Sequence, residues 1–67
     1  MCEAIVYLRE GEQEHELMRD VVLVKPEGEV YLLASLMGEQ KLVRARIDKI
    51  DFIKHTVHLT RVPGPNS

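Results

Sequence analysis

The sequence of 67 residues has one cysteine and no tryptophan, and its only aromatic residues are two tyrosines and one phenylalanine. A single cysteine excludes a disulfide within the chain. No stretch approaches the ~20 consecutive apolar residues that a membrane-spanning helix needs. The first residues lack the basic region and apolar segment of a secretory signal peptide. We therefore expect a cytoplasmic protein with a reduced thiol and no membrane partner.

The small size limits what the chain can bury. A domain of this length buries only about 60% of the surface of its unfolded chain, so its core is marginal. Domains this small usually gain stability from disulfides, bound metals or oligomerisation. Since a disulfide is excluded, we expect the additional stability to come from a bound metal, a second subunit, or both.

The net charge of −2 argues against bulk binding to nucleic acid, but the charge is unevenly distributed. Residues 1–30 carry eight acidic and three basic residues, a net charge of −5, and residues 31–67 carry three acidic and six basic residues, a net charge of +3. Such asymmetry can mark an interaction surface. The interpretation we favour is that the two halves attract each other across one fold.

The apolar pattern is typical of an all-β chain, because short runs of Val, Ile, Leu and Tyr alternate with turn residues. We expect the strand at 3–9 to be central or to face a dimer partner, since both of its faces are apolar. Residues 21–24 read as a buried strand that ends at Pro26, which cannot donate to a ladder. Further strands are expected at 30–36, 40–47 and 56–62, with residues 14–18 forming a short edge strand or a helical turn.

The apolar alternation slips after Ile47, and a bulge near Asp48 and Lys49 would restore it for Ile50 and Phe52. Phe52 is expected in the core or an interface. The fold class predicted is all-β: a small SH3-like or OB-like barrel, or a strongly twisted antiparallel sheet of five to six short strands. Residues 1–62 form the single domain, and residues 63–67 form a flexible tail.

Cys2 is the candidate metal ligand. If Met1 is removed, the amine and thiolate of Cys2 form one chelate ring; if Met1 stays, its amine, the Cys2 amide nitrogen and the thiolate form two fused rings. Nitrogen and sulfur donors in a plane suit nickel(II) or copper(II). Two copies in a dimer would supply four ligands. The alternative is an incidental thiol, since free cysteine often behaves as a small apolar residue.

A catalytic cysteine would need a histidine as its base, and the candidates are His15, His55 and His58. So small a domain leaves little room for a substrate pocket, so we expect no enzyme and no catalytic residues. His58 could join Cys2 as a ligand if the first and last strands pair. The ordinary interpretation of these histidines is that they are solvated.

A basic strand face supplies the alternative function. Lys41, Arg44, Arg46 and Lys49 could contact an RNA backbone on a small barrel. Against this, few aromatic residues are available to stack on bases. The plain interpretation is a solvated face balanced by the acidic first half.

The sequence resembles the CooT family over residues 1–61, with matching segments at 1–4, 20–22, 36–41, 46–51 and 58–59. The most specific parts are Cys2, the Gly38-Glu39 turn and the segment 46–51. CooT proteins are small cytoplasmic nickel-binding proteins, and many are also labelled predicted RNA-binding proteins. The fold is similar to that of the HypC hydrogenase maturation chaperones, which share a cysteine at position two.

The resemblance implies a compact β fold, a homodimer, and nickel(II) held by Cys2. It also implies a metallochaperone or accessory factor for a nickel-dependent client enzyme such as carbon monoxide dehydrogenase. The chain has no histidine-rich tail, so storage of many nickel ions is not expected.

Overall fold

The computed structural model describes residues 3–63, in which every regular element is a strand. The strands form one open sheet in the order β4-β3-β2-β1-β6-β5. The all-β prediction of a small, strongly twisted sheet is confirmed. No helix in the described part of the chain could cross a membrane. The strand bounds are β1 (Ala4–Glu10), β2 (Gln13–Glu27), β3 (Val30–Ser35), β4 (Gln40–Val43), β5 (Ala45–Asp51) and β6 (Thr56–Arg61).

Strand β1 is central, as its two apolar faces predict. It pairs with β2 in antiparallel fashion and with β6 in parallel, where Ile5 lies opposite Thr56 and Tyr7 opposite His58. The parallel pair makes the sheet mixed, which the sequence pattern did not indicate. It brings the first and last strands side by side through pairing between residues far apart in the sequence.

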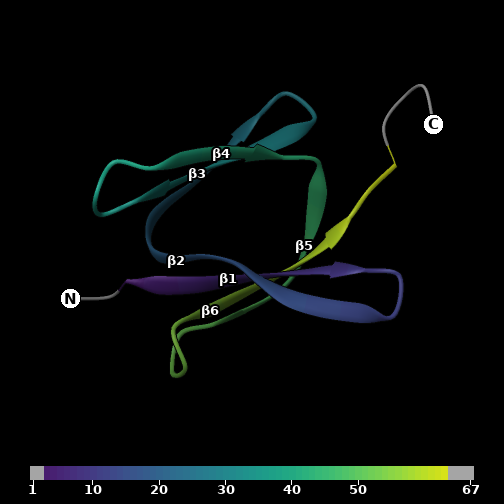
Figure 1. Cartoon of the computed structure of the whole chain (residues 1–67), viewed down its shortest axis with the longest axis horizontal. Helices are drawn as coiled ribbons and strands as arrows, with labels where there is room; N and C mark the ends of the chain where they lie inside the picture. The colour runs from purple at the N-terminus through teal and green to yellow at the C-terminus, as the bar shows by residue number, and fades with distance from the viewer. Residues whose placement is uncertain (1–2, 64–67) are drawn as a thin grey trace.

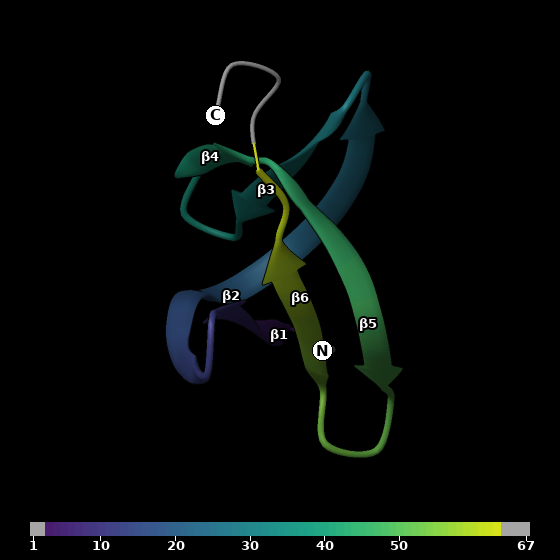
Figure 2. The same ribbon diagram turned by 90° about the vertical axis from the view of Figure 1, so that its right-hand side faces the viewer.

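Strand β2 bends the sheet into two layers (Figures 1 and 2). Its first part pairs with β1 and its last part with β3. At the bend Asp20 has φ 56°, and the register with β3 shifts between Val21 and Leu23. Residues 14–18 are therefore part of a long strand, and a helical turn there is excluded. The strand also continues through Pro26, which lies opposite Tyr31, so the expected end at this proline was wrong.

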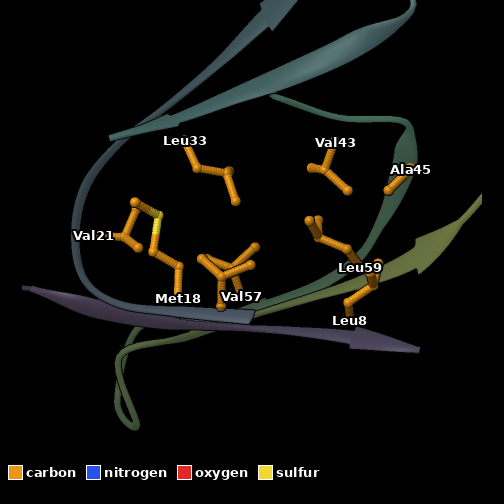
Figure 3. Packing of buried hydrophobic residues seen from close by; sticks show 9 residues of the cluster. Leu8, Met18, Val21, Leu33, Val43, Ala45, Val57 and Leu59 are labelled. Carbon is orange, nitrogen blue, oxygen red and sulfur yellow. The ribbon is translucent and has the colours of Figure 1, made fainter. Parts of the chain in front are cut away.

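The core lies between the two layers (Figure 3). Leu33 and Val43 come from one layer, and Leu8, Val57 and Leu59 come from the other. The inward orientation predicted for Val57 and Leu59 is confirmed, because both are buried. The buried apolar residues are Val6, Leu8, Met18, Val21, Leu33, Val43, Ala45, Val57 and Leu59.

Residues 21–24 are only partly buried, which corrects the expected buried strand. Val21 is in the core, but the register shift turns Val22 and Leu23 toward solvent. A bulge puts two consecutive residues opposite one, so strict alternation fails there.

The strand expected at 40–47 is two strands with a corner at Arg44. The carbonyl oxygen of Arg44 accepts a 3.0 Å hydrogen bond from the Val62 amide, which continues the pairing of β5 with β6. The predicted bulge is present, as a register shift between Ile47 and Lys49. The corner takes the chain from β4 in one layer to β5 in the other (Figure 1).

Phe52 is not in the core. It lies in the β5–β6 turn and is 83% exposed. The alternation that seemed to continue from Ile50 ends at Asp51, where turn geometry takes over from strand pairing.

Candidate functional site

Cys2, the candidate metal ligand, lies outside the described residues, and β1 begins at Ala4. The Ile5 amide donates a 2.9 Å hydrogen bond to the carbonyl oxygen of His55 in the β5–β6 turn. The start of β1 and the β5–β6 turn therefore lie side by side at one end of the sheet.

Three other segments lie side by side with the start of β1 at this end. Ala4 lies opposite Val21 of β2, which in turn lies opposite Ser35 of β3. The Leu36 amide donates a 2.8 Å hydrogen bond to the carbonyl oxygen of Asp20. The β5–β6 turn, the start of β1, the bend of β2 and the end of β3 thus form one continuous edge.

Exposed apolar side chains gather along this edge. Met37 is 87% exposed and Ile53 is 90% exposed, beside the exposed Phe52. Met37 lies in the β3–β4 turn, and Phe52 and Ile53 lie in the β5–β6 turn. Exposed apolar surface beyond scattered single residues often marks an interaction site. We call this set the apolar end; it consists of Val22, Leu36, Met37, Phe52 and Ile53.

The turn that carries Phe52 and Ile53 is fixed by Asp51. Its Oδ1 accepts hydrogen bonds from the amides of Ile53 at 3.0 Å and Lys54 at 2.9 Å. The Lys54 amide, and then the Ile53 amide, hold the pKa of the Asp51 carboxyl below its ordinary value. His55 completes the turn with φ 57°. The two apolar side chains are thus presented on an ordered hairpin.

His58 lies farther along the sheet, opposite Tyr7. Its ring stacks on the Tyr7 ring with centroids 5.3 Å apart, and its Nδ1 lies 2.9 Å from Oε2 of Glu14. The first and last strands do pair, as a ligand role for His58 beside Cys2 required. However, Nδ1 is already engaged, so only the other ring nitrogen is left for a metal.

The hydrogen bond with His58 lowers the pKa of the Glu14 carboxyl, and the charges of His58, Arg9 and Lys49 act in the same direction. The ionised carboxylate is thereby favoured in the folded protein. His15, on the same strand as Glu14, is half exposed.

No group of three or more His, Cys, Asp or Glu side chains that could hold a metal occurs in the part of the chain that the structure describes. Residues 3–63 of one chain therefore supply no complete side-chain site.

Ion pairs join the acidic first half of the chain to its basic second half. Arg44 Nη1 lies 2.7 Å from Oε1 of Glu29. Arg61 donates from Nε to the carboxylate of Glu10. These contacts agree with the interpretation that the two halves attract each other.

The four basic residues of the RNA alternative do not form one open patch. Arg44 is paired with Glu29, as described above. Arg46 is also paired, since its Nε lies 3.1 Å from Oδ1 of Asp48. Lys41 Nζ donates to the carbonyl oxygen of Leu17 at 3.2 Å. Lys49 lies on β5 opposite His58. Three of the four side chains already have partners within the chain.

A sequence profile of the family described as CO dehydrogenase accessory protein CooT matches residues 1–60. The chain belongs to the CooT family. A crystal structure of a candidate CooT protein from Carboxydothermus hydrogenoformans is similar to it, with a TM-score of 0.85 and 27% sequence identity over 92% of this chain and 100% of that chain. Among curated proteins the comparison finds no relative.

Membership of the CooT family confirms the resemblance inferred from sequence and indicates an accessory role toward CO dehydrogenase. The match begins at residue 1, so it includes Cys2 and every strand up to Thr60 of β6. What sequence reasoning missed is the exposure of Phe52 and Ile53. The available signal was Asp51, since aspartate often accepts hydrogen bonds from amides two and three residues on, which produces a turn.

Proposed function

We propose that this CooT protein is a nickel(II) carrier for CO dehydrogenase, with Cys2 as the ligand that defines its metal site. The observation that carries the proposal is the family match from residue 1 to residue 60, which includes Cys2. The strand that follows Cys2 is the central strand of the sheet. A ligand tethered to that strand is held close to a rigid body, which favours a defined site. The expected compartment remains the cytoplasm.

The chemistry of the donors supports nickel. A thiolate is a soft ligand, and the backbone nitrogens beside it can complete a planar chelate suited to nickel(II) or copper(II). Ligation displaces protons from the thiol and from nitrogen, so affinity should rise with pH. The role is binding and transfer, without catalysis by this chain.

The proposed carrier is a homodimer in which each chain supplies half of one nickel site. Two features support a dimer: the core is small, and exposed apolar side chains lie on turns at the end of the sheet where β1 begins. Covering Met37, Phe52 and Ile53 with a second copy would remove their apolar surface from water. Such a contact would also bring two Cys2 residues toward each other.

Activation of purified nickel-free CO dehydrogenase tests the proposal. The nickel-loaded chain is added in the presence of a chelator that removes free nickel, and CO oxidation is followed. We expect activation by the parent chain and none by Cys2→Ser prepared identically. Equal activation by Cys2→Ser would contradict the proposed role of this cysteine.

A further inference from the structure

The open sheet has two edge strands, β4 and β5, and they differ in how they are protected. Strand β5 carries a bulge next to Lys49, and its Arg46 and Asp48 form an ion pair. Bulges and charges of this kind keep other strands from pairing with an edge. Strand β5 is therefore protected against pairing with a strand of another molecule.

Strand β4 has neither a bulge nor an ion pair along it, although its short length and its lysine also limit pairing with other strands. It is four residues long, without proline, and its ladder with β3 runs without a register shift. Its one charged residue is Lys41, whose Nζ is drawn to the carbonyl oxygen of Leu17. Leu42, next along the strand, is 66% exposed. In Figure 2, β4 lies at the free margin of the layer that it forms with β3.

A depression of about 360 Å³ adjoins this edge, lined by Leu32, Gln40, Lys41 and Leu42. Leu32 lies opposite Leu42 in the ladder, so two leucines form its apolar wall. The Lys41 ammonium has three donors, and one of them is used on Leu17. The depression thus offers an apolar contact next to a row of backbone groups.

We propose that β4 is the docking edge for the client enzyme, which adds an extended segment to the sheet and places an apolar side chain in the depression. Strand addition gains affinity from main-chain hydrogen bonds and specificity from alternate side chains. The identity of the client rests on the proposed function.

The size of the edge favours a client over a second copy. A stable interface buries about 800 Å² on each partner, far more than a strand of four residues can cover. A carrier must also leave its client after delivery, which a small contact allows. The apolar end, which we assign to the contact between copies, lies on other segments.

The first experiment measures binding of purified nickel-free CO dehydrogenase to the immobilised metal-free chain. Leu42→Lys puts a charge on the β4 edge, and Ile50→Lys makes the same change on β5, where Ile50 is also exposed. We expect Leu42→Lys to weaken binding at least tenfold and Ile50→Lys to change it less than twofold. Equal effects of the two variants, no effect of Leu42→Lys, or no binding by the parent chain would overturn the proposal.

The second experiment separates main-chain pairing from mere proximity. Amide hydrogen exchange is compared with and without the enzyme, and exchange within residues 40–43 should slow while that of β5 stays unchanged. Absence of protection in β4 would overturn strand addition. Dissociation of a dimer by Leu42→Lys in sedimentation would assign the edge to a second copy instead.

Failure of this proposal is distinct from failure of the nickel proposal. Docking is measured on the metal-free chain, so Cys2→Ser should bind the enzyme as the parent does. If Cys2→Ser kept full nickel affinity, the nickel proposal would fall and the docking result would stand. If Leu42→Lys docked normally, the docking proposal alone would fall.

Discussion

The ring of His58 stacks on the ring of Tyr7, with 14° between their planes and 5.3 Å between their centroids. The same imidazole is hydrogen-bonded to Glu14, so one side chain of β6 links β1 to β2. The link crosses the parallel pair and the antiparallel pair that meet at β1. It ties the last strand to the first two.

This link predicts a pH dependence of stability. The pKa of the Glu14 carboxyl is lowered in the folded chain, chiefly by the hydrogen bond with His58. A lowered carboxyl pKa stabilises the fold above the unfolded value near ~4.3, and that stabilisation is lost as the pH falls through the folded value. We expect urea unfolding of Glu14→Gln to lose less stability between pH 5 and pH 3 than the parent.

Two controls accompany this prediction. Glu12→Gln, in the β1–β2 turn, should keep the parent's pH dependence. In a His58→Ala background, Glu14→Gln should change the dependence little, because its main partner is gone. A parental slope in Glu14→Gln itself would show that the contact does not act in solution.

The bend of β2 depends on Asp20, whose φ of 56° lies in the left-handed region. A β-branched residue there is strained, at a cost of roughly 1–2 kcal/mol. We expect Asp20→Val to lower the free energy of unfolding by about that amount and Asp20→Gly to lower it little or not at all. Chemical denaturation measures both. Equal stabilities of the two variants would contradict a left-handed bend.

The apolar end predicts a dimer, measured by sedimentation at micromolar concentration. The parent should sediment as two chains, and Phe52→Ser with Ile53→Ser should shift it toward the monomer, because both side chains are almost fully exposed in one chain. Leu42→Ser, at the β4 edge, is the control that should leave the dimer intact. A folded parent monomer of 7.7 kDa would remove the shared nickel site.

RNA binding is expected to be weak and salt-sensitive. Arg44 and Arg46 are paired with Glu29 and Asp48, so binding RNA would first require these ion pairs to break. Fluorescence anisotropy with a single-stranded RNA at physiological salt checks this. Submicromolar affinity that is lost in Arg44→Ala with Arg46→Ala would promote the RNA-binding alternative.

Local patterns in the sequence predicted much of the fold. The inward set Val43, Ala45 and Ile47 follows from alternation, and the bulge after Ile47 follows from its slip. The sequence did not decide between a strand and a helical turn for residues 14–18, because neither the strand period nor the helix period of apolar residues dominates there. This segment is a strand because it pairs with β1, and such a pairing between separate segments cannot be seen in the local sequence.

The candidate site was harder to predict, for physical reasons. The role of Cys2 as a metal ligand could be predicted from its chemistry and from the family resemblance. The groups around it depend on which segments of the chain lie side by side in the fold. The turns that carry Met37 and Phe52 lie at one end of the sheet because of the bend at Asp20 and the parallel pairing of β1 with β6. Neither feature leaves a periodic signal in a single sequence.

The central claim is that Cys2 makes this protein a nickel carrier, and a nickel titration of the protein with its native amino terminus tests it most directly. We predict one nickel(II) per dimer, sulfur-to-nickel charge-transfer absorption, and affinity that rises with pH as thiol and nitrogen lose protons. Cys2→Ser should abolish the absorption and nearly all affinity, whereas His15→Ala should change little. His58→Ala reports whether an imidazole shares the site. Nickel binding by Cys2→Ser as tight as that of the parent would contradict the account.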